Sequence, residues 1–147
     1  YLYRRIKGSL SADPIPLGQA KVVRPGDCLT IVTYGAAVYW ALEVAEQLGS
    51  QVEVIDLRCL QPLDEATVFE SVKKTSKVIL LHEAQKTLGM GAELSARIAQ
   101  ELFEYLDAPI VRVAAPDSPI PFSPNLEKEW LPGVAQLAEA CRKLLAY

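Results

Sequence analysis

The chain has 147 residues, an ordinary length for a single domain, and half of them are hydrophobic, which is enough to fill a core. Its 15 basic and 18 acidic residues give a formal net charge of −3. This balance, without a marked basic cluster, argues against a nucleic-acid-binding protein.

Two further absences narrow the class of protein. No apolar run approaches the ~20 residues of a membrane-spanning helix, so no membrane association is expected. The three cysteines form no CxxC pair, which disfavours a zinc site or a disulfide framework and indicates a reducing compartment.

The first residues have the composition of a linker. Residues 1–18 mix aromatic, basic, serine and proline residues without a clear period. We therefore expect residues 1–19 to be a linker and residues 20–147 to be the domain. The chain starts at Tyr1 and its only methionine is Met90, which predicts a fragment or a processed product.

Predicted strands alternate with helices along the chain. The strands are short, apolar and rich in β-branched residues, and in chain order they cover residues 20–24, 29–33, 52–57, 77–81 and 110–113. Gly49 is a typical C-terminal cap of the first helix, and Asp64 is a typical N-cap of the second. A third helix follows Gly91, and the last covers residues 134–144. Residues 114–133 hold five of the ten prolines, and we expect them to be irregular and extended.

This alternation predicts an α/β fold, a three-layer sandwich in which helices cover both faces of a mostly parallel five-stranded sheet. Continuous apolar strands agree, because parallel strands are buried on both faces. The first short strand is the candidate for an antiparallel neighbour.

The segment after the third parallel strand is the main candidate for chemistry. His82, the only histidine, and Glu83 follow that strand, where ligands gather in open α/β sheets, so they are candidates for acid–base or polar contacts in a crevice. Gly89 and Gly91 precede a helix, whose start could hold an anion. We favour the structural interpretation of both features. The histidine would hydrogen-bond to the backbone, and the glycines would allow a tight turn and close helix packing. No second ligand lies nearby in sequence, and Leu94 replaces the third glycine of a dinucleotide motif.

No other catalytic pattern stands out. Ser71 and Ser76 lack histidine or aspartate companions at a motif spacing, so we expect both at the surface. The residues alone therefore predict an α/β domain with a surface for partners.

Several blocks of the sequence, taken in order, resemble one family. They are Ile31–Gly35, Glu53–Arg58 with Pro62–Asp64, His82–Ala84, Ala108–Val113 and Asp117–Pro121. Their succession across almost the whole chain is similar to the transketolase-like C-terminal domain of the β subunit, or β-like half, of thiamine-diphosphate-dependent 2-oxo acid dehydrogenases. These are the E1 components of pyruvate or branched-chain type.

The resemblance implies a division of labour. Thiamine diphosphate and Mg²⁺ would bind in the full enzyme between two other domains, one of which would precede Tyr1. No catalytic, cofactor-binding or metal residue is therefore carried over, and this chain alone should be inactive. Its implied partners are the E1 α subunit or N-terminal half, a second β subunit and the subunit-binding domain of the E2 acyltransferase. The implied location is the bacterial cytoplasm or the mitochondrial matrix.

Two acidic groups are candidates for docking E2, because the subunit-binding domain of this family is small and basic. Asp107 should be exposed, since Pro109 turns the chain out of its helix around Ala108. The carboxylate at Tyr147 is the second candidate. Asp107 could instead only terminate its helix.

Two alternatives for the whole chain are a stand-alone binding or regulatory module of this fold and a domain of another thiamine-diphosphate enzyme such as a transketolase.

Overall fold

The computed structural model describes residues 15–147, so most of the predicted linker lies outside the described residues. At its centre is a sheet of order β1-β3-β2-β4-β5. The strands are β1 (Lys21–Arg24), β2 (Leu29–Thr33), β3 (Val52–Asp56), β4 (Val78–Gln85) and β5 (Val111–Ala115). β2 to β5 run parallel, and β1 pairs antiparallel with β3. The predicted mostly parallel sheet with an antiparallel first strand is confirmed.

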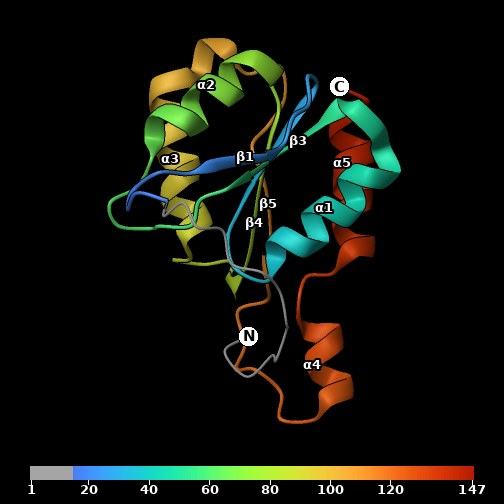
Figure 1. The fold of residues 1–147 in the computed structure, drawn as a ribbon. Helices are drawn as coiled ribbons and strands as arrows, with labels where there is room; N and C mark the ends of the chain where they lie inside the picture. Colours follow the sequence, from blue (N-terminus) through green and yellow to red (C-terminus); the bar gives the residue numbers. More distant parts are fainter. Residues whose placement is uncertain (1–14) are drawn as a thin grey trace.

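Helices cover both faces of the sheet, which confirms the predicted three layers (Figure 1). One face packs against α1 and α5, and the other against α2 and α3. The helices are α1 (Ala37–Leu48), α2 (Glu65–Thr75), α3 (Met90–Leu102), α4 (Pro124–Trp130) and α5 (Val134–Leu145), with short 3₁₀ turns at Gly49–Gln51 and Phe103–Tyr105. Among the described helices, none has the length and apolar character that a membrane crossing requires.

The strand sequences explain the layers. Every residue of β2 is buried, because β2 lies between β3 and β4 and has helices on both faces. Its alternate residues enter opposite cores: Ile31 packs in the cluster with α1 and α5, and Val32 in the cluster with α2 and α3. A continuous apolar strand is therefore what a central parallel strand requires.

Both predicted helix caps are present. Asp64 accepts a hydrogen bond from the backbone N–H of Thr67 at 3.1 Å, and it also accepts one from the N–H of Ala20 at 2.9 Å. Gly49 ends α1 with a φ of 74°, a conformation that glycine adopts without steric cost. The two residues thus fix where α1 ends and α2 begins.

A buried polar cluster joins α2 to the sheet near the amino ends of the strands. The Glu53 carboxylate accepts hydrogen bonds from the Ser71 hydroxyl, from the Lys74 ammonium and, at 3.2 Å, from the backbone N–H of Gly26. The hydroxyls of Thr30 and Ser71 lie 2.6 Å apart. The surface position predicted for Ser71 is therefore wrong: the hydroxyl is buried because it faces polar partners on the sheet.

β4 is longer than the sequence suggested. It continues to Gln85, which pairs with Ala115 of β5 after a register irregularity. His82 and Glu83 are therefore strand residues, and the prediction that they lie in the following loop is wrong. The apolar run ends at Leu81, but pairing with β5 extends the strand beyond the fully buried part of the sheet.

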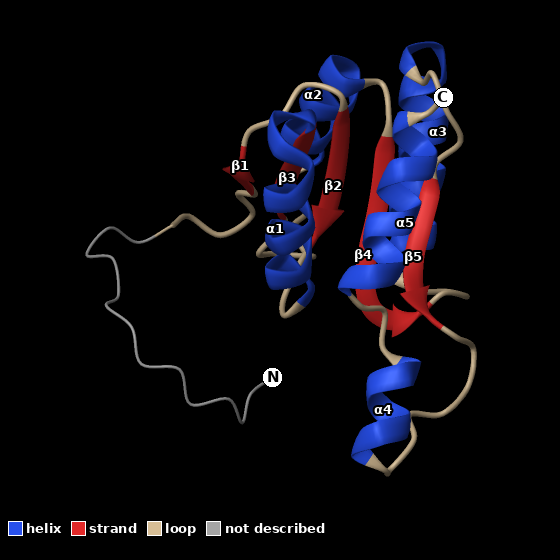
Figure 2. Ribbon diagram, turned by 90° about the vertical axis from the view of Figure 1, so that its right-hand side faces the viewer, coloured by secondary structure: helices blue, strands red, loops and turns tan. Residues whose placement is uncertain are grey.

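The proline-rich stretch 114–133 is not irregular throughout. Residues 124–130 form α4, which begins with Pro124, a position where proline is tolerated because its missing N–H would have no helical partner. The Trp130 indole N–H donates to the Ser118 hydroxyl at 2.9 Å. The expectation of an extended segment is therefore wrong for α4, which lies beyond the ends of β4 and β5 (Figure 2).

The three cysteines lie in different places and carry free thiols. Cys28, just before β2, donates its thiol hydrogen to Asp27 at 3.2 Å, and Cys59, in the connection after β3, donates to the carbonyl of Gln61 at 3.2 Å. Cys141 is buried in α5, and burial raises its pKa to about 12.

Candidate functional site

The carboxyl ends of β2, β3, β4 and β5 meet at one edge of the sheet, because these strands run parallel (Figure 2). The loops that follow the strands gather there, and in open α/β sheets ligands bind at this edge. His82, Glu83, Gly89 and Gly91 all lie at this carboxyl edge.

The imidazole of His82 is enclosed. The residue is 1% exposed, and its ring stacks with that of Tyr34 at a centroid distance of 6.3 Å. Nδ1 lies 3.0 Å from the carbonyl oxygen of Ala84, so it donates there in the neutral ring. Nε2 is then an acceptor, and it is buried without a hydrogen-bond partner among residues 15–147. The contact with backbone matches the favoured sequence interpretation, and the enclosed ring presents no face to a substrate in this domain.

Gly89 and Gly91 leave the space that the His82 ring occupies. A Cβ atom at Gly89 would lie 2.7 Å from Cε1 of His82, and one at Gly91 would lie 2.6 Å from Nε2. Gly89 is the N-cap of α3, so the first turn of this helix packs directly on the ring. The geometry supports close packing as the role of both glycines, and the anion at the helix start stays a prediction that no contact supports.

Glu83 is the more accessible residue of the pair. With Trp40 it lines a cleft of about 710 Å³ bounded by α4 and the start of α5. Burial raises the pKa of Tyr34, and the negative charge of Glu83 raises it further. A polar ligand at this edge would therefore meet the Glu83 carboxylate before the His82 ring.

Replacing His82 with asparagine should remove a pH dependence of stability. Burial lowers the pKa of His82, and the charge of Arg112 adds to this effect against the hydrogen bond to Ala84, so the fold favours the neutral ring. The stabilisation is complete above the unfolded-state pKa of about 6.5 and is lost as the pH falls from that value to the lower folded-state pKa, by at most about 1.4 kcal/mol per pH unit.

Denaturant titrations of the wild type and His82→Asn between pH 5 and 7.5 test this expectation, because no other histidine titrates in the chain. The difference in unfolding free energy, wild type minus variant, should shrink as the pH falls. A constant difference would show that the pKa of His82 is the same in the folded and the unfolded state.

Among the described residues, no group of three His, Cys, Asp or Glu side chains is arranged to hold a metal ion. Asp56 pairs with Arg58 at 3.6 Å. Asp117 accepts from the N–H and the hydroxyl of Thr87, and these hydrogen bonds lower the pKa of Asp117. Asp56 and Asp117 are thus engaged separately, and they do not form the oxygen cluster that Mg²⁺ prefers.

Asp107 lies at the opposite, amino edge of the sheet. It is exposed, as predicted, and its backbone N–H donates to the carbonyl of Ser76 at 2.9 Å. It takes part in none of the ion pairs found among residues 15–147. Asp107 lines an apolar groove of about 600 Å³ together with Phe103 and Pro109.

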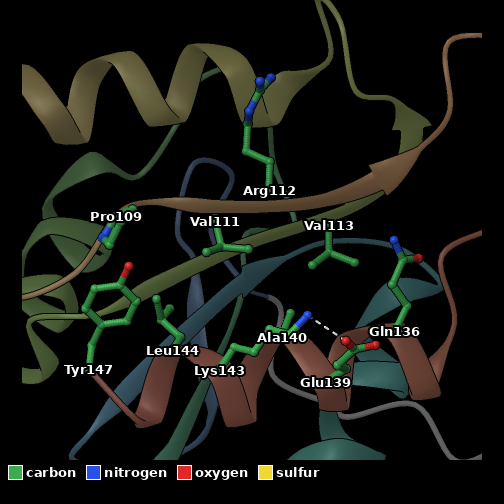
Figure 3. Close-up of a pocket in the computed structure, with 10 residues that line it drawn as sticks. All are labelled: Pro109, Val111, Arg112, Val113, Gln136, Glu139, Ala140, Lys143, Leu144 and Tyr147. Carbon is green, nitrogen blue, oxygen red and sulfur yellow. Dashed lines mark ion pairs between the residues drawn. The ribbon is translucent and has the colours of Figure 1, made fainter.

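Tyr147 lines a second groove, of about 420 Å³, that runs between β5 and α5 (Figure 3). Pro109 lines both grooves, so the two docking candidates lie on either side of one proline. Figure 3 shows the Tyr147 ring pointing toward Pro109, and Lys143 and Glu139 form an ion pair of 2.6 Å on the α5 side. The structure thus brings Asp107 and Tyr147 to one surface.

Sequence reasoning did not find the lining of this groove. Val111 and Val113 of β5 point across it toward α5, and Arg112 borders it. The sequence carried no direct signal for it, because the groove depends on β5 being an edge strand with three of its five residues only partly buried.

Comparisons with known proteins identify relatives along nearly the whole chain. It is 44% identical over 138 residues to the pyruvate dehydrogenase E1 component subunit beta of Rickettsia felis, covering 92% of this chain and 42% of that protein. It is also 44% identical over 134 residues to the acetoin:2,6-dichlorophenolindophenol oxidoreductase subunit beta of Cupriavidus necator, covering 89% of this chain and 40% of that one. The chain thus spans about two fifths of these relatives' lengths.

The solved structures agree in fold. A split-gene transketolase, described as an inactive β4 tetramer, superimposes with a TM-score of 0.79 at 26% identity, covering 96% of this chain and 46% of the other. The family model of the transketolase C-terminal domain matches residues 18–137. With this match over most of the chain, and with the five-stranded sheet described above, the protein belongs to the transketolase C-terminal domain family.

Proposed function

We propose that this chain is the C-terminal domain of the β subunit, or β-like half, of a 2-oxo acid dehydrogenase E1 component. The complete enzyme would decarboxylate a 2-oxo acid oxidatively and pass the acyl group to lipoamide on E2. The similarity to a pyruvate dehydrogenase E1 β subunit over nearly all of this chain carries the proposal. A stand-alone module is less well supported, because the curated relatives found here are subunits of larger enzymes.

The domain's own part would be assembly. The described residues do not fit thiamine diphosphate with Mg²⁺, because they hold no carboxylate cluster for the metal and the one histidine at the carboxyl edge is enclosed. The cofactor would therefore belong to the other domains of the complete enzyme. The E1 α subunit or N-terminal half and a second β subunit would pack against this domain, in the bacterial cytoplasm or the mitochondrial matrix.

The test uses the full-length reading frame that encodes this chain, expressed together with the α subunit. We expect 2-oxo-acid-dependent reduction of a dye such as 2,6-dichlorophenolindophenol, and we expect it to require thiamine diphosphate and Mg²⁺. The 147-residue chain alone should show neither the activity nor cofactor binding in calorimetry. Ketol transfer between sugar phosphates without any 2-oxo acid activity would instead make the protein a transketolase.

An acetoin-oxidising enzyme is the second candidate function. One observation favours it: the identity to the acetoin oxidoreductase β subunit equals that to the pyruvate dehydrogenase β subunit. The same dye assay separates the two candidates, because acetoin can be supplied in place of a 2-oxo acid. Activity with acetoin and none with pyruvate or branched-chain 2-oxo acids would decide for the second.

We further propose that Asp107 and Tyr147 dock the E2 subunit-binding domain. The two residues line apolar grooves that share Pro109 and that a small domain could cover. A basic partner would pair with the Asp107 carboxylate while it buries the groove lining, which includes Tyr147. The contact would be salt-dependent, because exposed charges are screened over about 8 Å at physiological ionic strength.

Changing Asp107 to alanine should weaken this binding by about 1–3 kcal/mol, the usual cost of removing one partner of a charge-assisted contact. Calorimetric titration of the full-length protein with the cognate subunit-binding domain, at two salt concentrations, measures the effect. Glu46→Ala is the matched control, since Glu46 is an exposed acid on α1 that lines neither groove. Equal affinities for the Asp107 variant and the wild type would place docking elsewhere.

A further inference from the structure

Large exposed hydrophobic side chains occur in several of the segments at the carboxyl edge of the sheet. They belong to the segments that precede β1 or follow β3, β4 and β5, and they are Leu17, Leu60, Leu88, Ile120, Phe122 and Leu126. We call this set the apolar edge. Exposed apolar side chains that occur together on one surface are typical of a contact with another protein surface.

α4 is the part of the apolar edge that projects furthest. Figures 1 and 2 show this helix beyond the carboxyl ends of β4 and β5, away from the helices that cover the sheet. Phe122, just before α4, is 105% exposed, and Leu126 on the helix is 59% exposed. In α4 only Trp130 is buried, so the projecting helix adds a single side chain to the hydrophobic core of the domain.

Hydrogen bonds hold this projection in place. The Gln85 side chain donates to the carbonyl of Ser118 at 3.1 Å, and the Trp130 indole donates to the Ser118 hydroxyl. Next to them, Asp117 accepts from Thr87, which immediately precedes the 95%-exposed Leu88. These hydrogen bonds fix the backbone next to the exposed side chains, which lowers the entropy cost of docking.

The chain enters the domain at this same edge. Lys21, the first residue of β1, pairs with Asp56, the last residue of β3, so β1 starts beside the carboxyl end of its neighbour. Before it, Gly18 packs on Pro62 in the connection between β3 and α2. A polypeptide that precedes the domain would therefore be tethered next to the apolar edge.

We propose that the apolar edge, with Phe122 at its tip, docks on the domain that precedes this one in a full-length β chain. The inference rests on the proposed function in one respect, namely that such a domain exists. In the relatives most of the length lies outside the matched part, and the matched family is a C-terminal domain, so that length precedes it. A short tether gives the preceding domain a millimolar effective concentration at the apolar edge, which favours it over a second copy.

The test places the photo-crosslinker p-benzoylphenylalanine at position 122 of the full-length protein, co-expressed with its α subunit. After irradiation we expect a crosslinked species that migrates as a single β chain on a denaturing gel. Peptide mapping should locate the crosslink in the residues that precede this domain. The same crosslinker at position 103 is the control, because Phe103 is 77% exposed at the opposite edge of the sheet and should give no such crosslink.

Every other outcome overturns the inference. A species of twice the β mass, mapped to residues of this domain, would make a second copy the occupant. A crosslink to the α subunit would make that subunit the occupant, and a yield no higher than at position 103 would leave the apolar edge uncovered. A reading frame without a preceding domain would overturn the proposed function as well. Normal 2-oxo acid activity without the intrachain crosslink would overturn this inference alone.

Discussion

Replacing Gly26 with alanine should destabilise the domain by about 3 kcal/mol, at the upper end of what overpacking in a core costs. A Cβ atom at this position would lie 2.3 Å from the backbone nitrogen of Glu53 and 2.3 Å from the carbonyl carbon of Val52. Both are backbone atoms at the start of β3, which pairs with β1 on one side and β2 on the other. The strand cannot retreat without loss of these pairings, so the turn before β2 would have to move.

Denaturant unfolding followed by tryptophan fluorescence would measure the loss. Gly133→Ala is the matched control, because nothing lies within 4 Å of the position of its Cβ and its φ of −125° suits alanine. The control should change the unfolding free energy by no more than about 0.5 kcal/mol. Equal effects of the two substitutions would mean that the contact with β3 does not limit residue 26.

Replacing Glu53 with alanine should cost about 3 kcal/mol as well, the lower end of the range for breaking a buried ion pair. The Glu53 carboxylate is 2% exposed and is the shared acceptor for Ser71, Lys74 and Gly26. Its loss leaves the Ser71 hydroxyl with fewer partners and the Gly26 N–H without its acceptor, and it opens a cavity under α2. Lys74 is half exposed and can turn to water, which keeps the cost at the lower end.

Glu65→Ala is the comparison for this prediction, since Glu65 also forms an ion pair from α2, with Arg97, but at the surface. Exposed pairs contribute roughly 0–1 kcal/mol. Thermal and chemical unfolding of both variants should therefore separate a buried from an exposed carboxylate. A loss at Glu53 no larger than the loss at Glu65 would show that the buried cluster adds no net stability.

The sequence predicted best those features that depend on residues close together in the chain. Buried parallel strands need continuous apolar runs, and the positions of β2 and β3 followed from them. Asp64 and Gly49 act within one turn of their own helices, so both caps could be predicted. The resemblance to the transketolase-like C-terminal domain of E1 β subunits rested on the order of several blocks, and the family match and the similarity to E1 β subunits confirm it.

The errors arose where distant residues decide the structure. Ser71 is buried because its hydroxyl donates a hydrogen bond to the buried carboxylate of Glu53, 18 residues away. No pattern in the sequence around Ser71 indicates this partner. β4 extends past its apolar run because β5 pairs with it up to Gln85. The exposure of Asp107 could be predicted from Pro109 nearby, but the grooves beside it require β5 and α5 to meet, which only the tertiary fold establishes.

The free cysteines make the two ends of the sheet separately addressable by thiol reagents. Cys28 lies before β2 at the amino edge, and Cys59 lies after β3 at the carboxyl edge. Cys141 should escape modification, because burial raises its pKa to about 12. The hydrogen bond to Asp27 raises the pKa of Cys28, so maleimide should label Cys28 slowly. A fluorophore on native Cys59 would then report on the end of the sheet where the chain enters, without any engineered residue.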